Sequence, residues 1–301
     1  MLIKRFLSLG LLLMSVAWLV PLQAAERVYI MAGQSNMMGR GGQVAELPAH
    51  YRRMPSNVRF FYQGRERDLA QSTYFGPEVS FAHQVARTFP HDEHLIIKHV
   101  ATGSSVQQWQ PGGALYEGLL RLVGYTRTDK NSVMPNIDAI FWMQGEADAM
   151  NLSRAQQYTP RLTRMIKRLR QDLAARNSLF IMGRVNSETP KFPGVSAVQR
   201  SQQQLAQILP NTLLVSSDGL DKIFDDIHYS SAGLVELGER FAERYIRHTQ
   251  TPENTTLQAN HKTDASTEPA AQAPPLANAN RPLNQPLPAN FEDYIVLPGM
   301  P

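Results

Sequence analysis

The sequence predicts an α/β fold: a three-layer α/β/α sandwich around a central five-stranded parallel sheet. Two observations predict it. Short, almost continuously apolar runs recur along the chain, which is typical of strands buried on both faces of a parallel sheet. Between these runs lie segments with apolar residues at helical spacing, and parallel strands need such crossover helices on the sheet faces.

The five predicted strands are rich in Ile, Val, Leu and aromatic residues. They cover residues 27–34, 95–101, 137–144, 179–185 and 212–218. Residues 39–72 fit this alternation poorly and are interpreted as a long insertion with one candidate strand over residues 58–62. Long loops of this kind are often functional.

The predicted helices alternate with the strands. One runs from Pro77, which suits a first helical turn, to about residue 89, and a second covers residues 114–125. A third begins at Ser153, which forms a capping-box pair with Gln156, and continues to about residue 173. The last two cover residues 196–209 and 231–248.

Residues 1–25 have the build of a secretory signal peptide: two basic residues, an apolar run over residues 6–20 and a small-residue cleavage site. A membrane anchor is the alternative, but the run is shorter than the ~20 residues that a span needs. No Cys follows it, which disfavours a lipoprotein. We therefore expect an exported protein, periplasmic or secreted, with no stable membrane span after signal cleavage.

Residues 26–249 are predicted to form one domain, and residues 250–301 a tail. The tail is rich in Pro, Ala and Asn and poor in large apolar residues, a composition typical of disorder. Residues 291–297 regain apolar character. This short segment docks on the body, docks on a protein partner, or does neither; the sequence leaves the three open.

Composition excludes several classes of function. The chain contains no Cys, so thiol catalysis and Cys-based metal sites are ruled out. Its net charge of +4 falls to +2 without Lys4 and Arg5 of the signal. The basic side chains between residues 161 and 170 would suit nucleic acid. Regularly spaced apolar residues between them favour the solvated face of a helix instead, and we expect no nucleic-acid partner.

Ser35 is the candidate nucleophile. It follows the first predicted strand directly, after Gly33 and between the amides Gln34 and Asn36. The carboxyl end of a parallel strand is where an open α/β sheet presents side chains to a ligand. A nucleophilic Ser also needs a base, a group that orients the base, and donors that stabilise an oxyanion.

His228 is the candidate base among eight histidines. It lies between the last predicted strand and the last helix, at the same sheet edge as Ser35. Asp225, three residues earlier, is placed to accept the proton of one ring nitrogen, and Asp226 is its rival. Alternatively, the two acids only cap the final helix. His99 is interpreted as a packed strand residue, and His91 and His94 as solvated.

Other candidates lie on neighbouring strand ends. Gly103, after the second strand, would offer a backbone N–H to the oxyanion together with that of Ser35, and Gln144, after the third, a side-chain N–H. For each residue alone, an ordinary βα turn is the favoured interpretation. Glu146 and Asp148 have no His at metal-ligand spacing, so we expect no metal and interpret them as loop hydrogen-bonding residues.

Substrate recognition is assigned to six side chains near these loops. Trp109 would stack on a sugar or pack in the core, and Arg40 and Arg184 would meet a substrate carboxylate or remain solvated. Gln34, Asn36 and Glu146 complete the set.

The α/β-hydrolase elbow Gly-x-Ser-x-Gly is absent, because Met37 stands at its second Gly. The chain instead resembles the SGNH hydrolase superfamily, in its sialate O-acetylesterase and carbohydrate esterase family 6 (acetylxylan esterase-like) branch. The segments that carry the resemblance are Gly33-Gln34-Ser35-Asn36-Met37, Phe75-Gly76-Pro77-Glu78, Gly103-Ser104-Ser105, Trp142-Met143-Gln144-Gly145-Glu146-Ala147-Asp148 and Asp225-Asp226-Ile227-His228-Tyr229.

The resemblance implies a flavodoxin-like sheet, a Ser35–His228–Asp225 triad with Gly103 in the oxyanion hole, acetylated sugars as substrates and no cofactor. Two departures from the general superfamily are Gln34, where an Asp is usual, and Gln144-Gly145-Glu146, in place of the block that holds the oxyanion-hole Asn. They leave the third oxyanion donor open.

These patterns together predict an exported serine esterase that removes O-acetyl groups from sialic acid, xylan or a cell-wall sugar. Two alternatives are a non-catalytic carbohydrate-binding or scaffold protein on the same fold, and a broader SGNH lipase or thioesterase. The complete set of Ser35, His228 and Asp225 favours the enzyme, and the scarcity of an apolar lid sequence disfavours the lipase.

Overall fold

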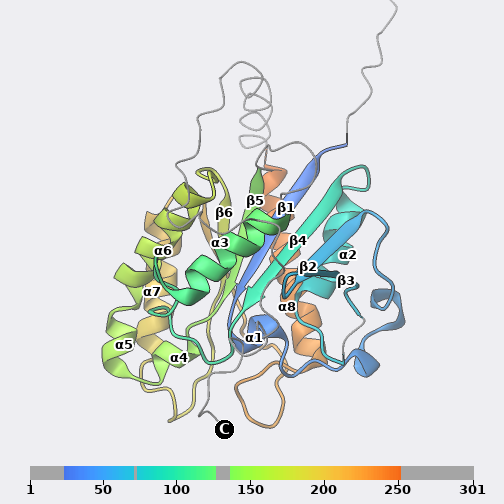
Figure 1. The fold of residues 1–301 in the computed structure, drawn as a ribbon. Coiled ribbons are helices and arrows are strands. Elements are labelled where there is room, and N and C mark those ends of the chain that lie inside the picture. Colours follow the sequence, from blue (N-terminus) through green and yellow to red (C-terminus); the bar gives the residue numbers. More distant parts are fainter. Residues whose placement is uncertain (1–23, 71–72, 127–135, 252–301) are drawn as a thin grey trace, which may run out of the picture.

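The computed structural model describes residues 24–70, 73–126 and 136–251. They form a three-layer α/β/α sandwich with a mostly parallel sheet, which confirms the predicted fold class (Figure 1). Nearly all of the predicted signal peptide and of the predicted tail lies outside the described residues. Among the residues that are described, no helix is both long and apolar enough to cross a membrane.

The sheet has seven strands in the order β3-β2-β4-β1-β5-β6-β7, so β1 lies at its centre. Neighbouring strands pair in parallel, except β2 and β3, which are antiparallel. The strands are β1 (Glu26–Gly33), β2 (Val58–Tyr62), β3 (Arg65–Arg67), β4 (Glu93–Val100), β5 (Ile137–Met143), β6 (Leu179–Gly183) and β7 (Thr212–Val215).

The prediction of five strands was therefore too low. The five apolar runs and the suggested strand over residues 58–62 are all present, but β3 was missed. Its three residues are all charged and form the sheet edge, where no apolar face has to be buried. A tight turn through Gln63 and Gly64, both at positive φ, folds β3 back on β2.

The helices follow the predicted alternation. They are α1 (Ser35–Met38), α2 (Glu78–Thr88), α3 (Ala114–Thr126), α4 (Glu146–Ala149), α5 (Leu152–Gln156), α6 (Tyr158–Asp172), α7 (Val195–Ile208) and α8 (Ser231–Thr249), with 3₁₀ turns at Val44–Glu46 and Ala49–Tyr51.

The predicted single helix from Ser153 is two helices, and the capping box of Ser153 with Gln156 is wrong. Asn151 caps α5 instead, because its side chain accepts a hydrogen bond from the N–H of Arg154 at 3.0 Å. Pro160, which has no N–H, lies in the first turn of α6, the place in a helix where a Pro is tolerated.

Aromatic side chains show how the helices divide between the two faces of the sheet (Figure 1). On one face, Phe81 of α2 and Tyr245 of α8 both contact Tyr29 of β1. On the other face, Trp142 of β5 contacts Trp109 and donates a hydrogen bond to Tyr158 of α6. Because strand side chains alternate between faces, both layers of the core are built on the same central strands.

Two expectations about polar residues need correction. His94 is not solvated: it lies on β4, is 1% exposed and contacts the hydroxyl of Tyr29 and the carbonyl of Phe89. Arg170 is not on the solvated face of α6, because it donates buried hydrogen bonds to the carbonyls of Ser178 and Asn211. His99 is packed, as expected, with Nε2 3.1 Å from the carbonyl oxygen of Leu115.

Candidate active site

Ser35 is fixed at the carboxyl end of the central strand. The N–H of Gln34 donates to the carbonyl of Met143 on β5, and Ser35 then opens the short helix α1. Gly33 has a φ of 145°, and a Cβ there would lie 2.1 Å from the oxygen of Met143. Only Gly therefore lets the chain leave the strand so close to β5, and this places the 4% exposed Ser35 at the sheet edge.

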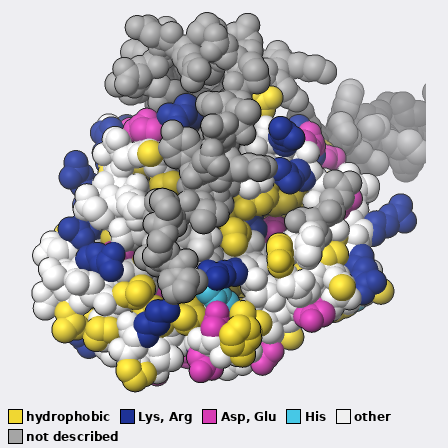
Figure 2. Space-filling view, turned by 60° about the horizontal axis from the view of Figure 1, so that its bottom comes forward, with side chains coloured by type: hydrophobic (Ala, Val, Ile, Leu, Met, Phe, Trp, Pro, Cys, Tyr) yellow, Lys and Arg dark blue, Asp and Glu magenta, His cyan; other side chains and the backbone are white. Residues whose placement is uncertain are grey.

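The structure brings together the three residues that the sequence proposes as a triad. Oγ of Ser35 lies 2.9 Å from Nε2 of His228, and Nδ1 of His228 lies 2.5 Å from Oδ2 of Asp225. One ring nitrogen of His228 thus faces a hydroxyl and the other a carboxylate. Figure 2 looks toward the edge of the molecule where α1 and α4 lie, and a histidine side chain is visible there among basic, acidic and apolar side chains.

Asp225 rather than Asp226 faces the imidazole. Its second oxygen, Oδ1, accepts hydrogen bonds from the N–H groups of Ile227 and His228, both at 2.9 Å. Burial alone would raise the pKa of Asp225, but these hydrogen bonds and that of the His228 ring hold it below its usual value, so the carboxylate stays ionised. Asp226 is exposed and adopts a φ of 58° in the turn between them.

Two backbone N–H groups that follow the paired strands β1 and β4 are free of described partners. No described residue accepts a hydrogen bond from the N–H of Ser35 or from that of Gly103, whose φ of 68° puts it in a left-handed turn after β4. These are the two backbone donors that the sequence proposes for an oxyanion hole.

Gln144 does not have the free N–H that the sequence analysis expects. Its Nε2 donates to the carbonyl of Ser104 at 2.8 Å and to Oδ2 of Asp148 at 2.7 Å, which uses both of its hydrogens. Asp148 also accepts from the N–H of Val106 at 2.8 Å. Gln144 and Asp148 therefore hold the loop that follows Gly103, in agreement with the interpretation of Asp148 as a loop hydrogen-bonding residue.

Trp109 does not stack on a substrate. It is fully buried, packs edge-on against Trp142 and His99, and donates its Nε1–H to Oγ of Ser104 at 2.8 Å. The alternative of core packing is the correct one. The sequence did not indicate this burial, because the residues around Trp109 in the chain are mostly Gln, Gly and Pro.

The remaining candidate contacts fall into two groups. Gln34, Asn36 and Glu146 are at most 3% exposed, and Asn36 and Glu146 hydrogen-bond each other at 2.7 Å. Arg184 is half-buried and pairs with Asp218 at 2.5 Å, while Arg40 is exposed beside α1.

Two features near the site were missed by sequence reasoning. Phe224, directly before Asp225, is 98% exposed; a large apolar residue beside two Asp residues was the available signal. Lys98 of β4 forms a buried ion pair with Glu78 at 2.7 Å and also donates to the carbonyl of Met38 at the end of α1. A Lys within an apolar strand was its signal.

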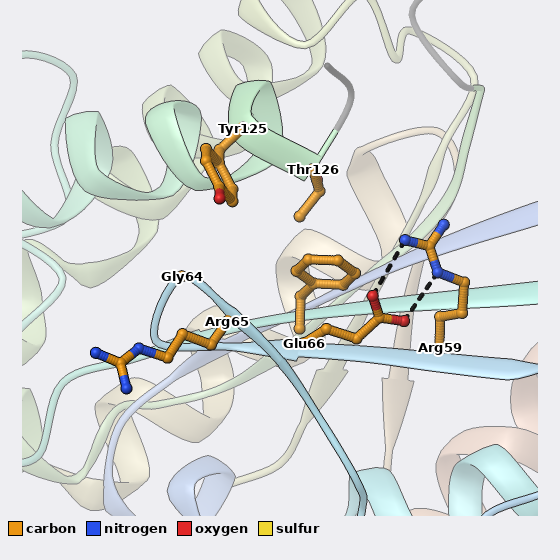
Figure 3. A pocket seen from close by; sticks show the side chains of 7 residues that line it. Arg59, Gly64, Arg65, Glu66, Tyr125 and Thr126 are labelled. Atoms are coloured by element: carbon orange, nitrogen blue, oxygen red, sulfur yellow. Dashed lines mark hydrogen bonds and ion pairs between the residues drawn. The ribbon is translucent and has the colours of Figure 1, made fainter. Parts of the chain in front are cut away.

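A cavity of about 500 Å³ lies away from these residues (Figure 3). It lies between the β2–β3 hairpin and the end of α3, and its lining includes Phe61, Tyr125 and the ion-paired Arg59 and Glu66. None of the proposed catalytic residues lines it.

Comparisons with known proteins identify a family of carbohydrate esterases. The model of a family described as "Carbohydrate esterase, sialic acid-specific acetylesterase" matches residues 25–247. A protein of Arabidopsis thaliana named "Probable carbohydrate esterase At4g34215" is 26% identical over 245 residues, which cover 73% of this chain and 90% of that protein.

Solved structures share the fold. The crystal structure of that Arabidopsis protein superposes with a TM-score of 0.65 at 23% identity, covering 73% of this chain and 98% of that one. The crystal structure of NanS superposes with a TM-score of 0.62 at 18% identity, covering 75% of this chain and 98% of that one. XAC1771, described as a carbohydrate acetylesterase from Xanthomonas citri, gives 0.53 at 16% identity over 73% and 56% of the two chains.

Proposed function

This chain belongs to the sialic acid-specific acetylesterase family of carbohydrate esterases and is a carboxylic ester hydrolase. From that premise we propose that it removes O-acetyl groups from carbohydrates through a Ser-His-Asp acyl-enzyme mechanism. The observation that carries the proposal is the continuous hydrogen-bonded series from Ser35 through His228 to the ionised Asp225. It supplies a nucleophile, a base and an orienting carboxylate in one line.

In the first half of the reaction, Nε2 of His228 takes the proton of Ser35 as Oγ attacks the acetyl carbonyl carbon. The backbone N–H groups of Ser35 and Gly103 donate to the oxyanion that forms, and each such donor contributes roughly 3 to 4 kcal/mol to lowering the barrier. The imidazolium then protonates the departing sugar oxygen as the ester bond breaks. Asp225 fixes the reactive tautomer of the neutral imidazole and stabilises the imidazolium once it forms.

In the second half, His228 takes a proton from a water molecule that attacks the acetyl-Ser35 ester. Collapse of the second tetrahedral intermediate releases acetate and returns the proton to Ser35. Gln144 acts indirectly: through Ser104 and Asp148 it holds the loop that presents Gly103. This role replaces the side-chain oxyanion contact that the sequence analysis expects of it.

The substrate class in this proposal is an acetylated carbohydrate such as an acetylated sialic acid, xylan or cell-wall sugar. Phe224 is the aromatic residue that offers a ring face to the sugar, because Trp109 is buried and Phe224 adjoins Asp225 at 98% exposure. Export to the periplasm or the medium also belongs to the proposal and rests on the composition of residues 1–25.

Hydrolysis of a nitrophenyl acetate by the wild type and by Ser35→Ala tests the mechanism. We expect the wild type to form a Ser35-linked acetyl group that mass spectrometry detects after rapid quenching, and the variant to form none. Equal, buffer-level rates for both proteins would overturn the proposal. Binding of acetylated sugars without turnover would favour the non-catalytic carbohydrate-binding alternative.

A panel of acetylated sialic acid, acetylated xylan and acetylated peptidoglycan fragments then identifies the sugar. A preference for long-chain acyl esters over all three would favour the lipase alternative instead.

A further inference from the structure

We propose that Asn36 and Glu146 form a clamp that positions the base relative to the nucleophile. The inference rests on the proposed function and deepens it. The sequence suggests substrate contacts for both, and for Glu146 also loop hydrogen bonds. The two side chains are 2% and 3% exposed, and their polar groups face protein. In this assignment they are positioning residues, which act through His228 and do not touch the substrate.

Asn36 joins the two loops of the site. Its Nδ2 donates to the carbonyl of Ile227 at 3.2 Å, and its Oδ1 accepts from the N–H of Tyr229, also at 3.2 Å. Ile227 and Tyr229 are the two neighbours of His228 in the chain. The residue next to the nucleophile therefore holds the backbone on both sides of the base.

Glu146 fixes which way the Asn36 amide points. Its Oε1 accepts the second Nδ2 hydrogen at 2.7 Å, so Nδ2 faces two acceptors and Oδ1 faces the Tyr229 donor. A flipped amide would set oxygen against both acceptors and NH₂ against a donor, and would lose all three hydrogen bonds. Glu146 comes from α4, so the clamp ties β5 to the loops after β1 and β7.

The loop that carries His228 is tied to the body on two sides. Lys222 and the hydroxyl of Tyr229 donate to Asn186 at 3.0 and 3.1 Å, and Asn36 joins the loop to α1. Between β7 and α8, the backbone hydrogen bonds of this loop include two that cross it. The N–H of Ile223 donates to the carbonyl of His228, and the N–H of Ser230 donates to the carbonyl of Asp221. Both lie within the loop, and so does the contact of His228 with Asp225. These bonds shape the loop, whereas Asn36 sets its distance from α1 and hence the 2.9 Å separation of Ser35 and His228.

The electrostatic surroundings of Glu146 agree with a hydrogen-bonding role in a closed site. Burial is the largest influence on Glu146 and raises its pKa, and the nearby Asp148 raises it further. Hydrogen bonds from its own backbone N–H and from Asn36, together with the charge of Lys222, lower the pKa. Its Oε2 is buried and has no partner among the described residues. An amide at this position would keep the acceptor that Asn36 uses and remove the buried charge.

Three variants test the clamp: Asn36→Ala, Glu146→Ala and Glu146→Gln. A displacement of about 1 Å at a reacting group costs roughly 100-fold in rate. We expect Asn36→Ala and Glu146→Ala to lower kcat on a nitrophenyl acetate by about that factor, with KM within about twofold. Glu146→Gln, which retains the acceptor, should recover most of the loss. Asn57→Ala is the matched control, because Asn57 ties a loop to the carbonyl of Asp92 at the opposite sheet edge.

Amide hydrogen exchange gives a readout that does not depend on activity. The N–H of Tyr229 should exchange about tenfold faster in Asn36→Ala than in the wild type, and at the wild-type rate in Asn57→Ala. If Asn36→Ala does not fold, Asn36→Leu has nearly the same size, lacks both the Nδ2 donor and the Oδ1 acceptor, and should show the same two effects.

The outcomes separate the clamp from the proposed function. Wild-type kcat in a folded Asn36→Ala, or unchanged exchange of Tyr229, would overturn the clamp while leaving the esterase proposal intact. A loss in Glu146→Gln as large as that in Glu146→Ala would also overturn it, because the carboxylate charge would then matter rather than the acceptor. An inactive wild type with faster Tyr229 exchange in the variant would overturn the proposed function alone.

Discussion

Oγ of Ser35 lies 2.9 Å from Nε2 of His228, although 193 positions of the sequence separate the two residues. One residue follows the central strand of the sheet and the other precedes the last helix of the described body. The fold brings them together because β1 and β7 run parallel and both end at the same sheet edge. Predictions about this contact therefore concern the loops at that edge.

Replacing Asp225 by Asn should lower kcat on a nitrophenyl acetate by roughly 10⁴-fold, because an amide neither stabilises the imidazolium nor fixes the reactive tautomer. Asp226→Asn is the matched control: Asp226 is adjacent and exposed, and we expect a change below about threefold. Steady-state kinetics on both variants check the assignment. A larger loss of kcat in Asp226→Asn would show that Asp226, and not Asp225, is the carboxylate that orients His228.

Replacing Phe224 by Ala should reduce selectivity for acetylated oligosaccharides. Covering an exposed aromatic ring with a sugar removes apolar surface from water, and we expect kcat/KM on the oligosaccharide to fall about tenfold more than kcat/KM on a nitrophenyl acetate. Leu152→Ala, at an exposed apolar residue of α5, serves as control because it should leave this ratio unchanged. An unaltered ratio in Phe224→Ala would exclude the ring as a sugar contact.

Removing one partner of the buried Lys98–Glu78 pair should destabilise the fold. The two side chains are 1% and 4% exposed, and Lys98→Met would leave an uncompensated carboxylate at a cost of roughly 3 to 5 kcal/mol. Chemical denaturation measures this free energy of unfolding. The double variant Lys98→Met/Glu78→Gln should recover part of it, because no unpaired charge remains. A single variant as stable as the wild type would show that the pair is dispensable.

Stability should fall as the pH drops from about 6.5 to about 4, in part because of His99. Burial lowers the pKa of His99 from 6.5 to about 4. The hydrogen bond to Leu115 opposes burial only in part, and Arg121 adds a smaller lowering. In that window the unfolded chain binds a proton that the folded chain does not, so the free energy of unfolding decreases with falling pH, by up to about 3 kcal/mol.

His99→Gln checks this sign. Glutamine retains a donor for the carbonyl of Leu115 but does not titrate, so the variant should lose less stability than the wild type between pH 6.5 and pH 4. Burial lowers the pKa of His83 and His94 as well, so the free energy of unfolding of both proteins should still decrease to some extent as the pH falls. Identical slopes for the two proteins would contradict the assignment to His99.

The strands of the sheet were predictable because nearly continuous apolar runs have few other uses in a chain of this length. The positions of Ser35, Gly103, Gln144 and His228 at strand ends followed from the same pattern. The charged β3 gave no such signal, since an edge strand is held by its turn and its backbone pairing rather than by burial.

Which polar group faces which could not be read from the sequence. Gln144 and Asn36 carry the same amide chemistry, yet one holds a loop through Ser104 and the other contacts both neighbours of His228. The direction of each side chain depends on contacts 40 and 191 positions away. Trp109 likewise points inward, where it packs edge-on against Trp142 of β5.

The central position of β1 also has a consequence for biosynthesis. Residues 28–32 have no exposure in the folded protein, but their partners on β4 and β5 are translated 67 to 110 positions later. A nascent chain therefore exposes an apolar, unpaired strand until both neighbouring strands have left the ribosome. Chaperone binding in that state protects the chain from aggregation. Because His228 follows later still, the proposed mechanism requires almost the whole body to be made before hydrolysis can begin.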